Sequence, residues 1–216
     1  MQLTSDTKFV IGILLTTIIV IAGGAYITST KSQNIPVQTV PDSLASRLVR
    51  DDAPRIGASD AKVTFVEFVD FECPVCGSVH PIIKELQEAY KDRSVRFVFR
   101  NFPLSQHPHA FMASEAAMEA HNQNKFWEYN NMLFENQTSL TQEDLVRYAE
   151  TLGLDMDPFR QALENNSWEN RVREDITDGN ALSVQGTPTI FINNIRYSGR
   201  YLFEDFAKII DEQLNS

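Results

Sequence analysis

The chain has 216 residues, of which 43% are hydrophobic and 14 are phenylalanine, enough to form the core of one ordinary domain. Its 29 acidic side chains outnumber the 19 basic ones, and the net charge is −10. This acidic balance argues against nucleic acid or an anionic membrane surface as a partner, because both attract basic proteins.

An uncharged apolar run, FVIGILLTTIIVIAGGAYIT, occupies residues 9–28. About 20 such residues are enough for a helix to cross a bilayer. We therefore expect residues 1–30 to be a membrane anchor and the remainder of the chain to be exported. The alternative is a signal peptide, in which residues 1–25 are cleaved and the remainder is secreted.

The next segment has the composition of a tether. Residues 31–42 are polar and include Pro36 and Pro41, which is typical of a flexible linker. We assign residues 31–54 to this linker and residues 55–216 to the folded domain.

The domain opens with a strand, a helix and a second strand. Val63–Val69 is almost continuously apolar, as expected for a central strand buried on both faces. A helix over Pro74–Tyr90 and a strand over Val95–Phe99 follow. This order predicts a right-handed crossover and two parallel strands.

Residues 104–185 contain no convincing strand and predict an inserted, all-helical subdomain. The pattern of a sheet returns with Thr189–Ile192, and Asn193-Asn194 is a two-residue hairpin signal. Ile195–Tyr197 would pair with that strand, and Leu202–Leu214 would close the chain as a helix. The parallel pair and the hairpin together predict a mixed sheet in an α/β fold.

The chemistry of the chain points to its only two cysteines, Cys73 and Cys76, which lie between the first strand and the first helix. We expect Cys73 at the helix N-terminus, where unpaired N–H groups and the helix dipole favour an anion. Its thiolate would then be populated, and the more buried Cys76 would resolve any mixed disulfide that Cys73 makes. The pair is thus predicted to be a redox centre that needs no bound cofactor.

Two other interpretations of the pair stay open. Two cysteines at this spacing are half of many zinc sites, but no other cysteine exists, and His107 and His109 lie far downstream in a loop. A purely structural disulfide across so small a ring would remove little entropy from the unfolded chain. We therefore favour redox catalysis and expect no metal.

Three features together resemble the thioredoxin superfamily, specifically its membrane-anchored DsbA-like thiol–disulfide oxidoreductases. They are the sequence CPVC at 73–76 after an apolar strand, the helical insert, and Thr187-Pro188 before a hairpin. The stretch EFVDFECPVC at 67–76 looks like that family's motif, and the resemblance covers roughly residues 57–214. It implies a thioredoxin-like fold.

The resemblance also implies roles for five residues. Cys73 would be the attacking cysteine and Cys76 the resolving one. Pro188 would be a cis-proline facing the pair, and Thr187 would present its backbone to an extended substrate peptide. Glu67 would be a buried acid that exchanges a proton with Cys76. The alternatives are an ordinary strand-entry turn at Thr187-Pro188 and a half-exposed Glu67.

The direction of electron flow is a separate question. Val75 stands where the strong oxidants of the family have histidine, so it adds no charge or hydrogen bond to the Cys73 thiolate. We expect Asp70 and Glu72 to be solvated and screened, and the helix N-terminus to make the pair moderately oxidising. The alternatives are a thiol reductase or disulfide isomerase on the same fold, or a metal-binding module.

The expected partners are cysteine-containing exported client proteins and a membrane redox protein that regenerates the pair. The expected location is the cell membrane, with a single pass through residues 9–28 and the catalytic domain on the extracytoplasmic side.

Overall fold

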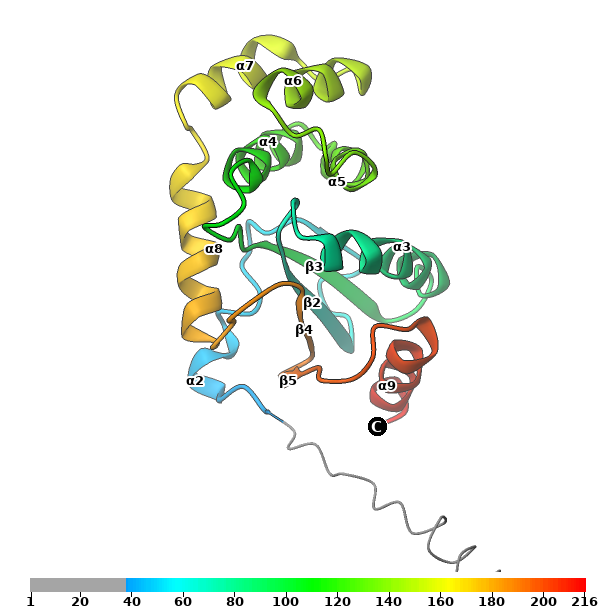
Figure 1. The fold of residues 1–216 in the computed structure, drawn as a ribbon. Helices are drawn as coiled ribbons and strands as arrows, with labels where there is room; N and C mark the ends of the chain where they lie inside the picture. Colours follow the sequence, from blue (N-terminus) through cyan, green and yellow to red (C-terminus); the bar gives the residue numbers. More distant parts are fainter. Residues whose placement is uncertain (1–37) are drawn as a thin grey trace, which may run out of the picture. The chain divides into compact units, whose positions relative to one another are not determined.

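The computed structural model describes residues 38–216 (Figure 1). A five-stranded sheet in the order β1-β3-β2-β4-β5 lies at its centre. The strands β2 and β3 are parallel, whereas all other neighbours are antiparallel, so the predicted mixed sheet is confirmed. The strands are β1 (Arg55–Ile56), β2 (Val63–Val69), β3 (Val95–Asn101), β4 (Thr189–Ile192) and β5 (Ile195–Arg196).

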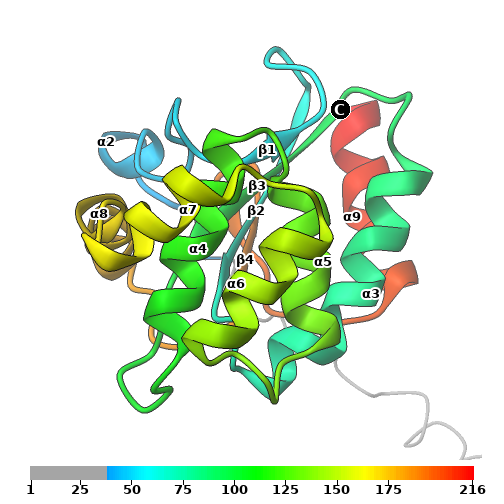
Figure 2. The ribbon, with the colours of Figure 1, turned by 90° about the horizontal axis from the view of Figure 1, so that it is seen from above.

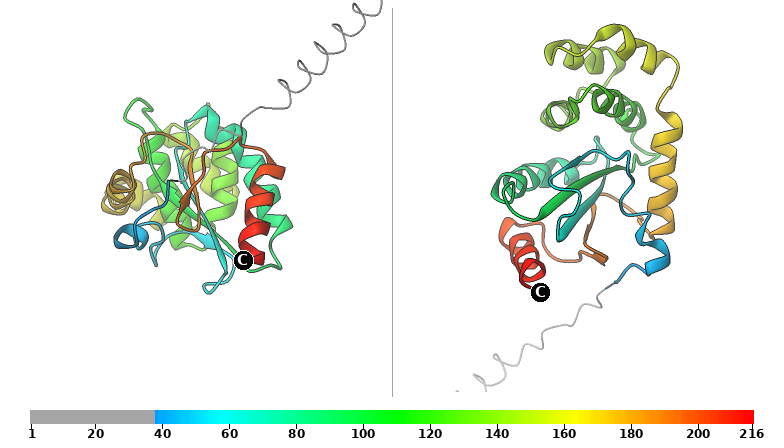
Figure 3. Two further views of the ribbon diagram at one scale, coloured as in Figure 1. Left: turned by 90° about the horizontal axis from the view of Figure 1, so that it is seen from below. Right: turned by 180° about the vertical axis from the view of Figure 1, so that it is seen from behind.

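The helices α3 (Pro74–Ala89) and α9 (Phe203–Asn215) cover one face of the sheet (Figures 1 and 3). Their apolar faces bury Ile83 and Phe206 against Phe65 of β2, and each of these side chains is at most 2% exposed. Burying a side chain of this size stabilises the fold by about 1.5–3 kcal/mol. This packing fixes the direction of α3 and therefore the place where its N-terminus lies.

The opposite face is covered by α8 (Glu169–Ala181) and by the N-terminal segment 38–53, which includes the short helix α2 (Asp42–Ala45). This differs from the expected linker at 31–54. The buried side chains in the segment are Val40, Leu48 and Ala53. Polar residues separate these three side chains, so the composition of the segment is that of a linker. One side of the segment nevertheless packs in the core. The strand β1 was also not predicted, because two residues carry no periodicity.

Four helices between β3 and α8 form a layer at the carboxyl ends of β2 and β3 (Figure 2). They are α4 (Ala110–Asn122), α5 (Phe126–Glu135), α6 (Gln142–Thr151) and α7 (Met156–Glu164). Alanines on α4 allow close packing, and a capping box formed by Thr141 and Asp144 begins α6. All residues between β3 and β4 that have regular structure are helical, as expected.

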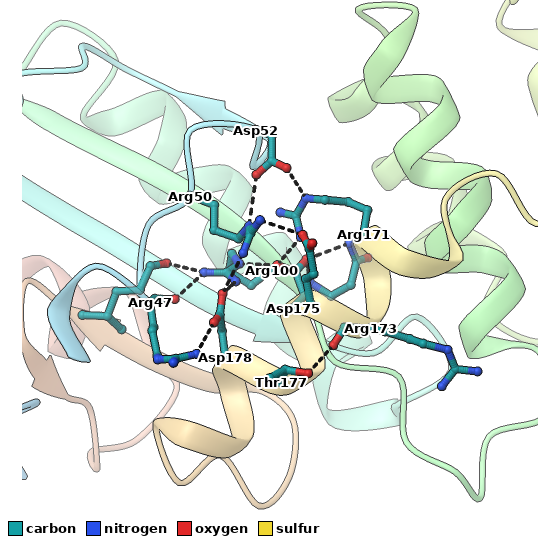
Figure 4. A network of polar contacts seen from close by, with 12 residues as sticks. Arg47, Arg50, Asp52, Arg100, Arg171, Arg173, Asp175, Thr177 and Asp178 are labelled. Carbon is teal, nitrogen blue, oxygen red and sulfur yellow. Dashed lines mark hydrogen bonds and ion pairs between the residues drawn. The ribbon is translucent and has the colours of Figure 1, made fainter. Parts of the chain in front are cut away.

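A buried ion-pair network joins the N-terminal segment to β3 and α8 (Figure 4). The guanidinium of Arg100 is fully buried, and it donates to the carboxylates of Asp175 and Asp178. It also donates to the backbone carbonyl of Leu48 at 2.9 Å, and Arg47 pairs with Asp178 at 2.9 Å. The network therefore fastens the segment that precedes β1 to the sheet.

None of the helices between residues 38 and 216 has the length and apolar character needed to cross a membrane. The predicted anchor at residues 1–30, with its apolar run at 9–28, lies outside the described residues.

Candidate active site

The two cysteines lie at the start of α3. Cys73 is the N-cap residue, with an extended backbone (φ −70°, ψ 119°), and Pro74 occupies the first helical turn. Proline suits this position because its missing N–H has no partner within the helix. The exposed fractions are 6% for Cys73 and 2% for Cys76, and both residues are free thiols. The geometry expected for the pair is therefore present.

The two sulfurs have opposite acidities. A hydrogen bond from the Cys76 thiol is the largest cause that lowers the pKa of Cys73 to about 5, and the backbone N–H groups of Cys76 and Val75 contribute in the same direction. Burial, followed by the hydrogen bond to Cys73, raises the pKa of Cys76 far above its ordinary value. At neutral pH the site thus holds a nucleophilic thiolate beside a protonated thiol.

The segment Thr187-Pro188 lies against Cys73, although the two are 114 residues apart in sequence. The peptide bond between Thr187 and Pro188 is cis, the geometry that the resemblance implies. In its thiol form, Cys73 donates from Sγ to the carbonyl oxygen of Thr187 at 3.3 Å. Tyr201 donates its hydroxyl to the carbonyl of Pro188 at 3.1 Å. When Cys73 is a thiolate it cannot donate, so this hydrogen bond to the Thr187 carbonyl is lost.

Glu67 is buried on β2, where its neighbours in register are Phe99 and Ile190. It is 9% exposed, and burial raises the pKa of its carboxyl to about 8. No hydrogen bond links it to either cysteine. The carboxyl is on the same face of β2 as Phe65, the face against which α3 packs. With a pKa of about 8, it is mainly protonated at neutral pH.

Asp70, three residues before Cys73, is completely buried. The expectation that it is solvated is therefore wrong. Its Oδ1 accepts the backbone N–H groups of Glu72 (2.7 Å) and Cys73 (3.1 Å). Its Oδ2 accepts from the backbone of Leu104 (2.7 Å) and from Nδ1 of His107 (2.8 Å). Aspartate side chains commonly accept a hydrogen bond from the backbone N–H two residues ahead. The position of Asp70 shortly before Cys73 was therefore the one feature of the sequence that could have indicated this contact.

Two further side chains tie the cysteine loop to the inserted helices. Glu72 accepts, through Oε2, the backbone N–H groups of His109 (2.6 Å) and Ala110 (2.7 Å) at the start of α4. A carboxylate is favourable at a helix N-terminus. Gln137, from the connection between α5 and α6, donates Nε2 to the carbonyls of Phe71 (2.7 Å) and Cys73 (3.0 Å).

Gly77 leaves room for the side chain of Gln137. A Cβ atom added to Gly77 would lie 1.9 Å from Oε1 of Gln137, so a larger residue there would force this side chain to move. No local pattern indicated Gln137, because it lies in a loop 64 residues after Cys73.

One large apolar side chain is exposed beside Cys73. Val75, between the two cysteines, is 46% exposed, which is unusual for a large hydrophobic side chain in this domain. Among residues 38–216, no group of three or more His, Cys, Asp or Glu side chains is placed to hold a metal ion. The pair of thiols is thus flanked by the cis-proline segment and by the exposed side chain of Val75.

Comparison with protein families and solved structures places this arrangement among known folds. Residues 50–212 match the family described as Thioredoxin. The crystal structure of oxidised BdbD from Bacillus subtilis aligns with a TM-score of 0.70 and 25% identity, covering 76% of this chain and 94% of that one. The thiol-disulfide exchange protein alpha-DsbA2 from Wolbachia pipientis aligns with a TM-score of 0.71 and 20% identity, covering 79% and 91% of the two chains.

Curated relatives share more sequence but are much longer. Na(+)/H(+) antiporter NhaA 3 of Salinispora tropica is 45% identical over 155 residues, which is 71% of this chain and 24% of that protein. Na(+)/H(+) antiporter NhaA 1 of Mycolicibacterium vanbaalenii is 36% identical over 177 residues, which is 79% of this chain and 28% of that protein. The chain thus spans about a quarter of the length of these relatives.

Proposed function

The chain belongs to the thioredoxin family as a DsbA-like member, and on this basis we propose that it is a thiol–disulfide oxidoreductase that introduces disulfides into exported client proteins. The observation that carries the proposal is the opposite acidity of the two thiols at the start of α3. Burial and a hydrogen bond keep Cys76 protonated, whereas the pKa of Cys73 is lowered to about 5. The name of the exchange protein from Wolbachia pipientis supports the same chemistry.

The reaction begins with the pair oxidised. A client thiolate attacks Sγ of Cys73, and the electron pair of the Cys73–Cys76 bond moves to the Cys76 sulfur, which takes up a proton. Glu67, protonated because burial raises its pKa to about 8, supplies that proton directly or through water. A second client thiolate then attacks the client sulfur of the mixed disulfide, and Cys73 leaves as a thiolate. The client loses two electrons, and the pair gains them.

The direction follows from which form of the pair the protein stabilises. Stabilising the Cys73 thiolate stabilises the reduced pair, which makes the disulfide a stronger oxidant. The helix N-terminus and the Cys76 thiol both act in this direction. Val75 does not stabilise the Cys73 thiolate. The negative charge of Asp70 destabilises the thiolate, although the Asp70 carboxylate accepts four hydrogen bonds. The balance supports an oxidase over the reductase or isomerase alternative.

Equilibration with glutathione tests this direction. We expect a reduction potential clearly above the value of about −270 mV that is typical of a thioredoxin reductant. We also expect the oxidised protein to restore disulfides in a reduced, unfolded client. A potential at the thioredoxin level together with no client oxidation would contradict the oxidase proposal and favour a reductase.

We expect Glu67→Gln to slow the attack of Cys76 on a mixed disulfide at Cys73, which is the reverse of the first step above, by about tenfold or more, because the amide cannot exchange the proton of Cys76. Alkylation of Cys73 in the reduced protein should stay close to the wild-type rate, since Glu67 is not bonded to Cys73. Rapid mixing with a model disulfide separates the two steps. The control is Glu85→Gln, which changes an exposed carboxylate on α3. Wild-type turnover in Glu67→Gln would make Glu67 a bystander.

A second readout of the same variant is the pH dependence of stability. The folded pKa of Glu67 is about 8, above the ordinary value of 4.5, so between these pH values the folded state keeps a proton that the unfolded state releases. The free energy of unfolding should therefore fall as pH rises through this window. The oxidised protein is the one to measure, because its thiols do not titrate. Glu67→Gln should flatten the profile.

Location and partners complete the proposal. The apolar run at residues 9–28 supports a membrane anchor, and the antiporter names of the curated relatives support a domain that works at a membrane. The thioredoxin domain would then lie on the extracytoplasmic side, where disulfides persist. Its partners would be exported proteins with cysteines and a membrane redox protein that reoxidises the pair. Cleavage of the run would give a secreted enzyme with the same chemistry.

A further inference from the structure

The loop that precedes the cysteines is held by one buried carboxylate. Asp70 is completely buried, and its two oxygens accept four hydrogen bonds at 2.7–3.1 Å. Two donors belong to the cysteine loop itself, and two belong to the loop after β3. A buried carboxylate without such partners would be strongly destabilising. Asp70 therefore joins two loops that are far apart in sequence.

His107 is the side chain among these donors. Its Nδ1 lies 2.8 Å from Oδ2 of Asp70, and its side chain is 21% exposed. The proton must be on Nδ1, because a carboxylate can only accept. The ring thus fixes the orientation of the Asp70 carboxyl group from the solvent side.

The orientation of Asp70 matters for the sulfur of Cys73. Oδ1 of Asp70 accepts the backbone N–H of Cys73, and this bond helps to set the extended N-cap conformation of that residue. In that conformation the amides of Val75 and Cys76 point at Sγ and contribute to the lowered pKa of Cys73. Rotation of Asp70 would loosen the N-cap and misalign these amides.

We propose that His107 is a positioning residue of the thiol site: it holds the Asp70 carboxylate, and through it the Cys73 backbone, in the arrangement in which the amides of α3 stabilise the thiolate. The inference rests on the proposed thiol–disulfide chemistry. It does not depend on whether the pair works as an oxidase or as a reductase, because the test compares the glutathione equilibrium of each variant with that of the wild type.

The test compares three variants. His107→Leu removes the donor to Asp70. His107→Asn keeps a donor, because the side-chain amide nitrogen of asparagine takes the place of ring Nδ1. His109→Asn makes the same change two residues later, at an exposed histidine. The readouts are the equilibrium constant with glutathione and the pH at which the thiolate absorption of Cys73 appears.

We expect His107→Leu to shift the glutathione equilibrium toward the protein disulfide by about fivefold, which corresponds to one hydrogen bond of ordinary strength. The thiolate should also appear at higher pH. His107→Asn should return both readouts to within about twofold of wild type, and His109→Asn should leave them unchanged. If His107→Leu does not fold, His107→Ala serves as the second variant without the donor.

An unchanged glutathione equilibrium in His107→Leu would overturn the proposal, even if the variant were less stable, because the contact would then be structural only. A full effect in His109→Asn would overturn it as well. If the wild-type pair itself shows no exchange with glutathione, the proposed function fails instead, and this outcome is distinct from the other two.

Discussion

Cys73→Ser is expected to lower the rate of thiol–disulfide exchange by more than about a thousandfold, to the level of the uncatalysed reaction. The expected loss is this large because Cys76 cannot take over. It is 2% exposed, and burial raises its pKa far above that of a free thiol. The measurement is the rate of client reoxidation. The variant should fold normally, because serine is close to cysteine in size.

Cys76→Ser is the matched control for this prediction. It keeps the nucleophile and removes the thiol that attacks a mixed disulfide at Cys73, so the mixed disulfides that this variant forms by attacking client disulfides should accumulate. Because a hydrogen bond from Cys76 is the largest cause of the lowered Cys73 pKa, a serine hydroxyl at that position should preserve much of the shift.

Alkylation separates the two thiols in the reduced wild-type protein. The rate at Cys73 should rise through about pH 5 and then level off, whereas Cys76 should react only after unfolding. Equal labelling of both thiols at neutral pH would contradict the assignment.

Arg100→Met is expected to destabilise the domain by about 3–5 kcal/mol, the largest effect on stability that we predict. The guanidinium of Arg100 and the carboxylate of Asp175 are both fully buried, and Asp178 is 8% exposed. Removing the cation takes a fully buried partner from both carboxylates: Asp175 keeps only Arg171, and Asp178 keeps Arg47 and Arg50, whose side chains are partly exposed. This loss costs more than the ion pair itself contributes. For a domain of this size the melting temperature should fall by roughly 10 °C.

The control for this prediction comes from the same network. Arg50 pairs with Asp178 as well, at 3.4 Å, but its side chain is 31% exposed. Arg50→Met should therefore cost less than about 1 kcal/mol. Replacing Asp175 by asparagine in the Arg100→Met background should recover part of the stability. A loss below about 1 kcal/mol for Arg100→Met alone would show that water or rearrangement compensates the carboxylates.

The sequence predicted those parts of the site that depend on local order. The apolar run of β2, the proline after Cys73 and the amphipathic pattern of α3 place both thiols without reference to the rest of the chain. The hairpin after Pro188 was likewise predicted from adjacent residues, Asn193-Asn194. Each signal lies within a few residues of the feature that it predicts, which is why these elements are found where they were expected.

The parts that the sequence did not predict depend on partners distant in the chain. Asp70 was expected to be solvated, but it is buried because the loop after β3 supplies two of its donors. No sequence motif surrounds Gln137. It can donate to the cysteine loop only because the fold places the end of α5 beside that loop. The segment 38–53 has the composition of a linker, but in the structure Arg100 donates hydrogen bonds to two of its backbone carbonyls and holds it against the sheet.

The contacts of Glu72 and Gln137 have a consequence for motion. Both bind the cysteine loop to the inserted helices, one through the start of α4 and the other through the connection that follows α5. The loop cannot swing outward without breaking these bonds, so loop and insert form one cooperative unit in local opening. We therefore expect any opening of the loop that exposes Cys73 further to be coupled to fluctuations of the helical layer and not to those of the sheet.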